Sequence, residues 1–226
     1  MKRGIVIFSL VVFVLLSYAL YQARVAAPTE QTMGDVQRIF YYHVPSAWTA
    51  FLLFFVNFIA SIWYLIKRSP AADAIAVTGA EVGVVFCTVV LVTGPIWARP
   101  VWGIWWTWDI RLTSTLVMWL IYVSYLILRK FSTSGQMPLM AAVLAVFGAL
   151  DIPLVYFSIW YFRTQHPQPV MGPGGSLDPR MRSVLLINWL AFLAFALLLC
   201  TIRYRLERLK QAMEETQVLE NLVQTN

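Results

Sequence analysis

Six long runs of apolar residues, separated by short polar stretches, dominate the chain. They cover about residues 4–22, 46–66, 75–97, 113–128, 138–160 and 183–202. A helix needs about 20 apolar residues to cross the hydrocarbon core of a bilayer, where the backbone must satisfy its own hydrogen bonds. We therefore expect an all-α membrane protein, with six transmembrane helices in one domain over residues 1–202.

Two end segments need separate interpretation. The first apolar run follows Lys2 and Arg3, as a signal peptide would, but it is long for a cleaved signal; cleavage would leave the sidedness of the other five spans unchanged. Residues 203–226 are first basic and then acidic, which predicts a short amphipathic helix in the cytoplasm. This helix would lie at the membrane interface or dock on a partner. Its apolar stripe comprises Leu206, Leu209, Met213, Leu219 and Leu222.

Composition excludes several classes of protein. Of the 226 residues, 60% are hydrophobic and 12% are charged, whereas a soluble domain carries about 25% charged residues. A soluble enzyme and a sizeable extramembrane domain are therefore excluded. The net charge of +6 comes from small basic clusters between apolar runs, which favours membrane topology over nucleic-acid binding. The sequence contains neither a CxxCH motif nor a P-loop, so we expect no covalent haem attachment to this chain and no nucleotide hydrolysis by a P-loop.

The distribution of basic residues predicts the orientation. With the N-terminus inside, the inner segments carry ten basic residues, including all four lysines, and the outer segments carry seven. Both termini are then cytoplasmic. The three longest connections, about 23–45, 98–112 and 161–182, lie outside, so we expect the function on the outer face.

Half of the ten tryptophans fall within twelve residues of the second outer segment: Trp97, Trp102, Trp105, Trp106 and Trp108. Trp102, Trp105, Trp106 and Asp109 have helical spacing and would share one face. That face predicts a flat aromatic platform for a large planar ligand, although an aromatic belt at the membrane interface is the alternative. Pro95 and Pro100, with neighbouring glycines, are expected to prevent a straight extension of the third span.

The chain has two histidines, and the topology puts both of them outside. His43 precedes the second span and His166 follows the fifth. Imidazole is a common axial ligand of haem iron, whereas zinc needs three or four protein ligands. Two histidines therefore suit an iron porphyrin. Arg38 and Arg111 are candidates for pairing with its propionates, or each anchors a helix end.

Two acidic residues lie inside predicted spans, where a charge is costly. Glu81 is close to the inner end of its span, where its carboxylate can reach water. Asp151 lies deeper, two residues before Pro153. Asp151 is a candidate for a role in a ligand path or a partner contact.

The segment Trp102–Ser114 (WGIWWTWDIRLTS) resembles the tryptophan-rich "WWD" signature of haem-handling membrane proteins. Together with the six spans, it makes the chain look like the haem exporter protein C family of cytochrome c maturation (CcmC). His43 in YYHVPSAW and His166 in RTQHP resemble the two outer histidines of that family, with Gln165 where we expect leucine. We take the WWD segment as about residues 97–114.

The resemblance implies a binding and transfer subunit rather than an enzyme. Haem b would be held transiently and without a covalent bond at the periplasmic face of the bacterial inner membrane. His43 and His166 would bind its iron, the four tryptophans from Trp102 to Trp108 would contact the macrocycle, and Asp109 would orient the loop or a partner. The stretch Pro167–Pro179 is a candidate for releasing one axial ligand.

The resemblance also implies partners. The haem chaperone CcmE would receive the haem, and the ATP-binding cassette subunits CcmA and CcmB and the single-span CcmD would assist, in contact with membrane lipid. Two alternatives remain. A b-type electron-transfer cytochrome usually places its histidines inside the spans, and a permease for a hydrophilic solute would bind no haem.

Overall fold

The computed structural model of the protein describes residues 2–131, 135–168, 171 and 177–224. Within this part of the chain, six helical segments are long and apolar enough to cross a membrane. The all-α class and the six predicted spans are therefore confirmed. The segments comprise α1 (Lys2–Tyr21) with the π-helical turn η1 (Gln22–Ala26), η2 (a 3-10 turn, Asp35–Ile39) with α2 (Phe40–Lys67), α3 (Pro70–Trp102), α4 (Ile110–Phe131), α5 (Met137–Gly148) with α6 (Asp151–Tyr161), and α7 (Pro179–Gln224).

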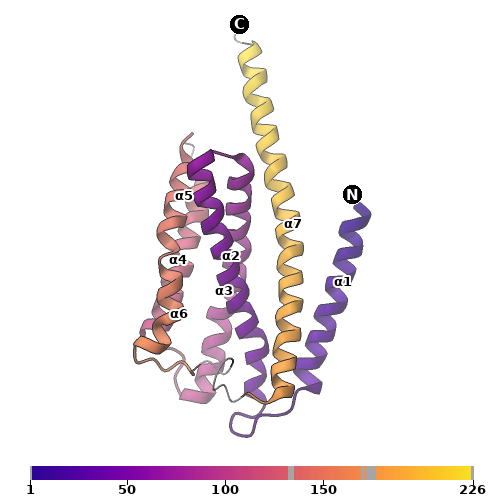
Figure 1. Ribbon diagram of the computed structural model, residues 1–226, viewed down its shortest axis with the longest axis vertical. Coiled ribbons are helices and arrows are strands. Elements are labelled where there is room, and N and C mark those ends of the chain that lie inside the picture. The colour runs from indigo at the N-terminus through magenta and orange to yellow at the C-terminus, as the bar shows by residue number, and fades with distance from the viewer. Residues whose placement is uncertain (1, 132–134, 169–170, 172–176, 225–226) are drawn as a thin grey trace.

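Successive segments run in opposite directions, as Figure 1 shows. The two termini lie toward one end of the bundle, together with the connections α2–α3 and α4–α5. The longer connections that follow η1, α3 and α6 lie at the opposite end. We call it the histidine end, because His43 and His166 lie there. This arrangement groups the three segments that the sequence placed on one side.

The helix α3 ends later than expected. It continues through Pro95 and Pro100 to Trp102, five residues beyond the expected bound of the third span at about residue 97. Gly103 ends the helix with a φ of +80°, a left-handed conformation that glycine adopts at low cost, and its amide donates to the Arg99 carbonyl at 3.0 Å. Residues 103–109 are not helical, so the predicted helical face of Trp102, Trp105, Trp106 and Asp109 is wrong.

The fifth span consists of two helices because Pro153 has no N–H group to continue the hydrogen-bond ladder. The carbonyl of Ala149, which a residue at position 153 would normally bond, instead accepts from the Ile152 amide at 3.2 Å. Asp151 begins α6 at this break. One of its carboxylate oxygens is buried and has no hydrogen-bond partner among the described residues.

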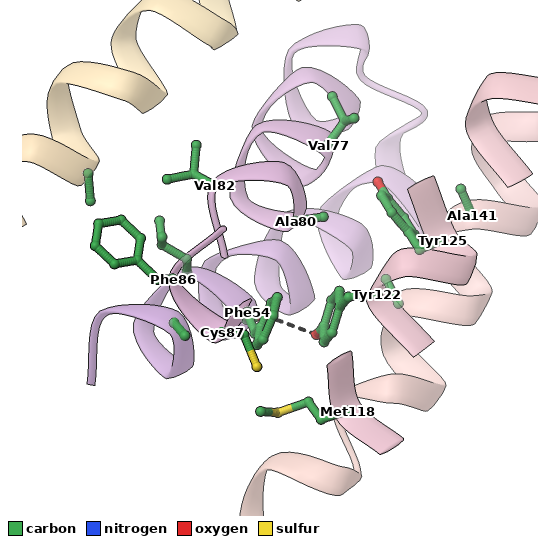
Figure 2. Close-up of a cluster of buried hydrophobic side chains, with 14 of the residues drawn as sticks. Phe54, Val77, Ala80, Val82, Phe86, Cys87, Met118, Tyr122, Tyr125 and Ala141 are labelled. Carbon is green, nitrogen blue, oxygen red and sulfur yellow. Dashed lines mark hydrogen bonds between the residues drawn. The ribbon is translucent and has the colours of Figure 1, made fainter. Parts of the chain in front are cut away.

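The core lies where α2, α3 and α4 meet (Figure 2). Small residues bring α2 and α3 together: a Cβ at Gly79 would lie 2.9 Å from the Leu53 carbonyl oxygen, and one at Gly83 would lie 2.6 Å from the Phe54 ring. The Phe54 ring stacks on Tyr122 of α4 with 3.8 Å between centroids. Close packing of small residues is what holds helices together in lipid, where apolar burial provides little driving force.

At the end opposite the histidines, buried ion pairs join α3, α4 and α7. Arg129 donates two hydrogen bonds to the Asp73 carboxylate, at 2.5 and 2.8 Å, and lies 3.6 Å from Glu207. Arg203 pairs with Glu207 at 2.8 Å and also with Glu81. The Glu81 carboxylate of α3 therefore pairs with an arginine of α7 and is not surrounded by water alone.

The helix α7 continues through the predicted cytoplasmic tail. Its 46 residues correspond to about 69 Å, more than twice the thickness of a hydrocarbon core of about 30 Å. Figure 1 shows its last turns rising clear of the bundle. The tail is thus helical but continuous with the span, and its predicted apolar stripe from Leu206 to Leu222 is exposed.

Candidate functional site

His43 lies in the first turn of α2, where this helix packs against α3. Its imidazole is half-buried, and Nδ1 lies 2.9 Å from the hydroxyl oxygen of Thr93. Gly94 follows Thr93 and lies against the same ring: a Cβ at Gly94 would be in ordinary contact with His43 Cε1, at 3.5 Å. This contact could not be predicted from the sequence, since Thr93 is 50 residues from His43 and carries no motif.

His166 lies in the connection after α6 and is also half-buried. Its Nδ1 lies 2.9 Å from the carbonyl oxygen of Pro167, and its amide donates to the Thr164 hydroxyl at 3.1 Å. Burial, followed by the positive charge of Arg111, lowers the pKa of His166 to about 4. The imidazole is therefore neutral at pH 7, which is the form that binds a metal.

The two histidines lie close enough for their charges to interact with each other, and Arg111 interacts with both. Because a carbonyl oxygen can only accept, Nδ1 of His166 carries the proton and Nε2 carries the lone pair. In both rings it is Nδ1 that is hydrogen-bonded to protein, so Nε2 is the atom left for a metal. The structure therefore brings together the two histidines that the sequence singled out.

Arg111 occupies the first turn of α4 beside the histidine pair. Its Nη1 donates to the backbone carbonyl of Val155 in α6 at 3.0 Å, which ties α4 to α6. Its Nε and Nη2 have no hydrogen-bond partner among the described residues. This arginine can therefore offer two donor nitrogens to an anion without giving up its contact with α6.

Asp109 connects the WWD segment to the histidine connection. Its Oδ1 accepts from the amides of Arg111 and Leu112, each at 3.0 Å, and so caps the N-terminus of α4. Its Oδ2 accepts from the Thr107 hydroxyl at 3.0 Å and from the Gln165 amide at 3.1 Å. Burial raises the pKa of Asp109, but the hydrogen bonds from Leu112, Gln165 and Thr107 together hold it below its usual value.

The tryptophans form two edge-to-face pairs instead of one platform. Trp97 and Trp102 pair at the end of α3 with 5.3 Å between ring centroids, and Trp106 and Trp108 pair in the non-helical segment at 5.9 Å. Trp105 and Trp108 are exposed over 59% and 76% of their surface. The Trp106 indole N–H is buried and has no partner among the described residues. The segment thus presents large apolar surface at the histidine end.

Arg38 contacts the connection between α1 and α2. Its Nη1 donates to the carbonyls of Ala23 and Ala27, at 2.9 and 3.3 Å, its Nη2 lies 3.4 Å from the Thr29 hydroxyl, and its Nε pairs with Asp35 at 2.9 Å. Every nitrogen of the guanidinium is therefore engaged in holding the α1–α2 connection. Arg38 thus anchors a helix end in this structure, which was the alternative interpretation, and its pairing with a propionate stays a prediction.

Among the residues that the structure describes, no group of three or more His, Cys, Asp or Glu side chains could hold a bare metal ion. A metal bound by the histidine pair would have to bring most of its own ligands, as an iron porphyrin does. Much of the predicted release stretch Pro167–Pro179, residues 169–170 and 172–176, falls outside the described residues.

Comparison with known proteins identifies the family. A family model described as "Heme exporter protein C" matches residues 1–219. The chain is 36% identical to the Heme exporter protein C of Bradyrhizobium diazoefficiens over 210 residues, which cover 92% of this chain and 80% of that protein. It is 33% identical to the Escherichia coli K12 protein of the same name over 180 residues, 79% of this chain and 73% of that one.

A similar likeness extends to mitochondria. A ccmC-like mitochondrial protein of Marchantia polymorpha, named for cytochrome c biosynthesis, is 33% identical over 182 residues, which cover 80% of this chain and 76% of that protein. The six spans agree with these likenesses. The chain is a multi-pass membrane protein and belongs to the heme exporter protein C family.

Proposed function

We propose that the protein binds haem at the outer face of the bacterial inner membrane and delivers it for cytochrome c maturation. The observation that carries the proposal is the histidine pair: the only two imidazoles of the chain lie near each other at one end of the bundle, and each has Nδ1 hydrogen-bonded to protein. His43 and His166 would bind the iron through Nε2. The cargo would be haem b, held without a covalent bond and only transiently.

The groups around the pair fit a haem. Arg111 has two donor nitrogens to offer to a propionate and lies beside both histidines. Trp102, Trp105, Trp106 and Trp108 would cover parts of the macrocycle, whose apolar edge would otherwise face water. Asp109 would fix the connection that carries His166 rather than touch the cargo.

The names of the relatives support a place in cytochrome c biogenesis. We infer that the recipient is the membrane-anchored haem chaperone CcmE, and that CcmA, CcmB and CcmD are the partners in the membrane. The histidine end would then face the periplasm and both termini the cytoplasm, in agreement with the lysine distribution. The chain would act as a binding and transfer subunit, with ATP hydrolysis in a partner chain.

A b-type electron-transfer cytochrome is the second candidate, and a transfer assay separates the two. The haem-loaded protein is incubated with the full-length chaperone in detergent, and covalent haem on the chaperone is detected after denaturing electrophoresis. We expect haem on the chaperone with the wild-type protein and little or none with His43→Ala. Haem that stays on this chain and only cycles between oxidation states would contradict delivery. A permease would show no haem absorption band at all.

A further inference from the structure

One side chain outside the predicted site contacts a candidate iron ligand directly. The Thr93 hydroxyl oxygen lies 2.9 Å from His43 Nδ1, and the two residues belong to different helices, α3 and α2. His166 has no comparable side chain, because its Nδ1 meets the backbone carbonyl of the next residue. Substitution of Thr93 can therefore alter the surroundings of His43 without removing the histidine itself.

The hydrogen bonds around Thr93 decide which atom carries the proton. Its hydroxyl donates to the Val89 carbonyl at 2.6 Å, with the Val90 carbonyl at 3.4 Å as a weaker acceptor. Carbonyl oxygens cannot donate, and a hydroxyl has one hydrogen. The Thr93 oxygen therefore offers a lone pair to His43, so that Nδ1 is protonated and Nε2 is free to bind iron.

We propose that Thr93 is a positioning residue for His43: it selects the tautomer with Nδ1 protonated and fixes the rotation of the ring. This inference rests on the proposed function, in which His43 binds haem iron. A partner on the second ring nitrogen fixes the orientation of a metal-binding imidazole and increases its basicity. In a helix pair that packs this closely, the acceptor holds the imidazole in place before the cargo arrives.

The experiment uses the purified full-length protein in detergent, titrated with haem and followed by the Soret band, electron paramagnetic resonance and the midpoint potential. Thr93→Val removes the acceptor and keeps the shape, so we expect haem affinity to fall by about 10- to 100-fold, as is typical for loss of such a partner. The resonance g-values and the midpoint potential should shift as well. Thr93→Ser keeps a hydroxyl and should restore all three readouts.

The same helix provides a matched control. Thr88 also donates to a carbonyl four residues earlier and accepts a ring N–H, from Trp119 at 2.8 Å. Thr88→Val removes an equivalent pair of hydrogen bonds away from the histidines, so its haem spectrum should match wild type. If Thr93→Val is poorly folded, as judged by size-exclusion chromatography, Thr93→Ala provides the same test with a smaller side chain.

The outcomes separate this inference from the proposed function. If Thr93→Val or Thr93→Ala binds haem with wild-type affinity, g-values and potential, or if Thr93→Ser fails to restore them, Thr93 does not position His43. The proposed function would survive that result as long as His43→Ala loses the wild-type spectrum. If the wild-type protein shows no haem spectrum that depends on His43, the proposed function itself fails.

Discussion

The Oδ2 atom of Asp109 lies 3.1 Å from the backbone nitrogen of Gln165 and accepts its hydrogen bond. The other oxygen of this carboxylate caps α4, so one side chain joins the WWD segment, a helix N-terminus and the residue next to His166. This contact explains how a histidine in a long connection is held beside one that lies on a helix. Asp109 therefore has two roles: one oxygen caps α4 and the other holds the residue next to His166. Substitutions can test these roles individually.

We expect Asp109→Asn and Asp109→Ala to differ. Asparagine caps helices about as well as aspartate, but its amide group cannot accept from Gln165 while its oxygen caps α4. Asp109→Asn should therefore weaken haem binding with little loss of thermal stability. Asp109→Ala should weaken binding and also lose about 0.5–2 kcal/mol of stability. Haem titration and thermal unfolding check the pair, and equal haem affinity in Asp109→Asn and wild type would contradict the role of this contact.

Arg111 should matter only for a haem that carries charged propionates. Arg111→Gln removes the cation beside the histidine pair, so haem affinity should fall about tenfold, as expected for loss of a charge-assisted hydrogen bond. The dimethyl ester of haem has no propionate charge and should bind both proteins equally. Arg163→Gln, an exposed arginine in the same region, is the control. An equal loss with haem and its ester would mean that Arg111 acts only through its contact with α6.

The close approach of α2 and α3 predicts a position that tolerates no side chain. In Gly83→Ala, the added methyl group would lie 2.6 Å from the Phe54 ring, which is itself stacked on Tyr122. Overpacking of this kind costs about 1–3 kcal/mol. Thermal unfolding in detergent should show this loss. Gly4→Ala, where nothing lies within 4 Å, should unfold at or slightly above the wild-type temperature.

The ion pairs at the opposite end should contribute to stability according to their burial. Arg129→Met would leave Asp73 buried without its cation, while Glu207 keeps only Arg203, at a cost of about 3–5 kcal/mol. Lys210→Met breaks an exposed pair with Glu214 and should cost less than about 1 kcal/mol. Thermal unfolding compares the two variants, and a similar shift in both would show that the buried network is not what holds α7 against α3 and α4.

The sequence predicted the spans and their alternation because both depend on simple lengths and counts. An apolar run of about 20 residues becomes a spanning helix almost regardless of its neighbours, and alternation then puts His43 and His166 at one end. The end of α3 was missed, although Gly103 and Asp109 are an ordinary helix stop and helix start. The helical spacing of the tryptophans is misleading at this point, because Gly103 ends the helix before Trp105.

Side-chain partners could not be predicted in the same way. Arg38 is five residues from His43, and spacing alone does not show that its guanidinium turns toward the α1–α2 connection. Thr93 is 50 residues from His43, and a single threonine in an apolar run is common. Contacts between helices depend on their rotation and depth, which a periodic pattern does not fix.

The most direct test of the central claim is the spin state of haem bound to the purified protein, measured in the wild type, His43→Ala and His166→Ala. The chain has no other histidine, so each variant leaves one imidazole. We predict a low-spin spectrum with two imidazole ligands in the wild type, and loss of that spectrum in each variant. A two-imidazole spectrum that persists after either substitution, or haem binding that neither substitution changes, would contradict the claim.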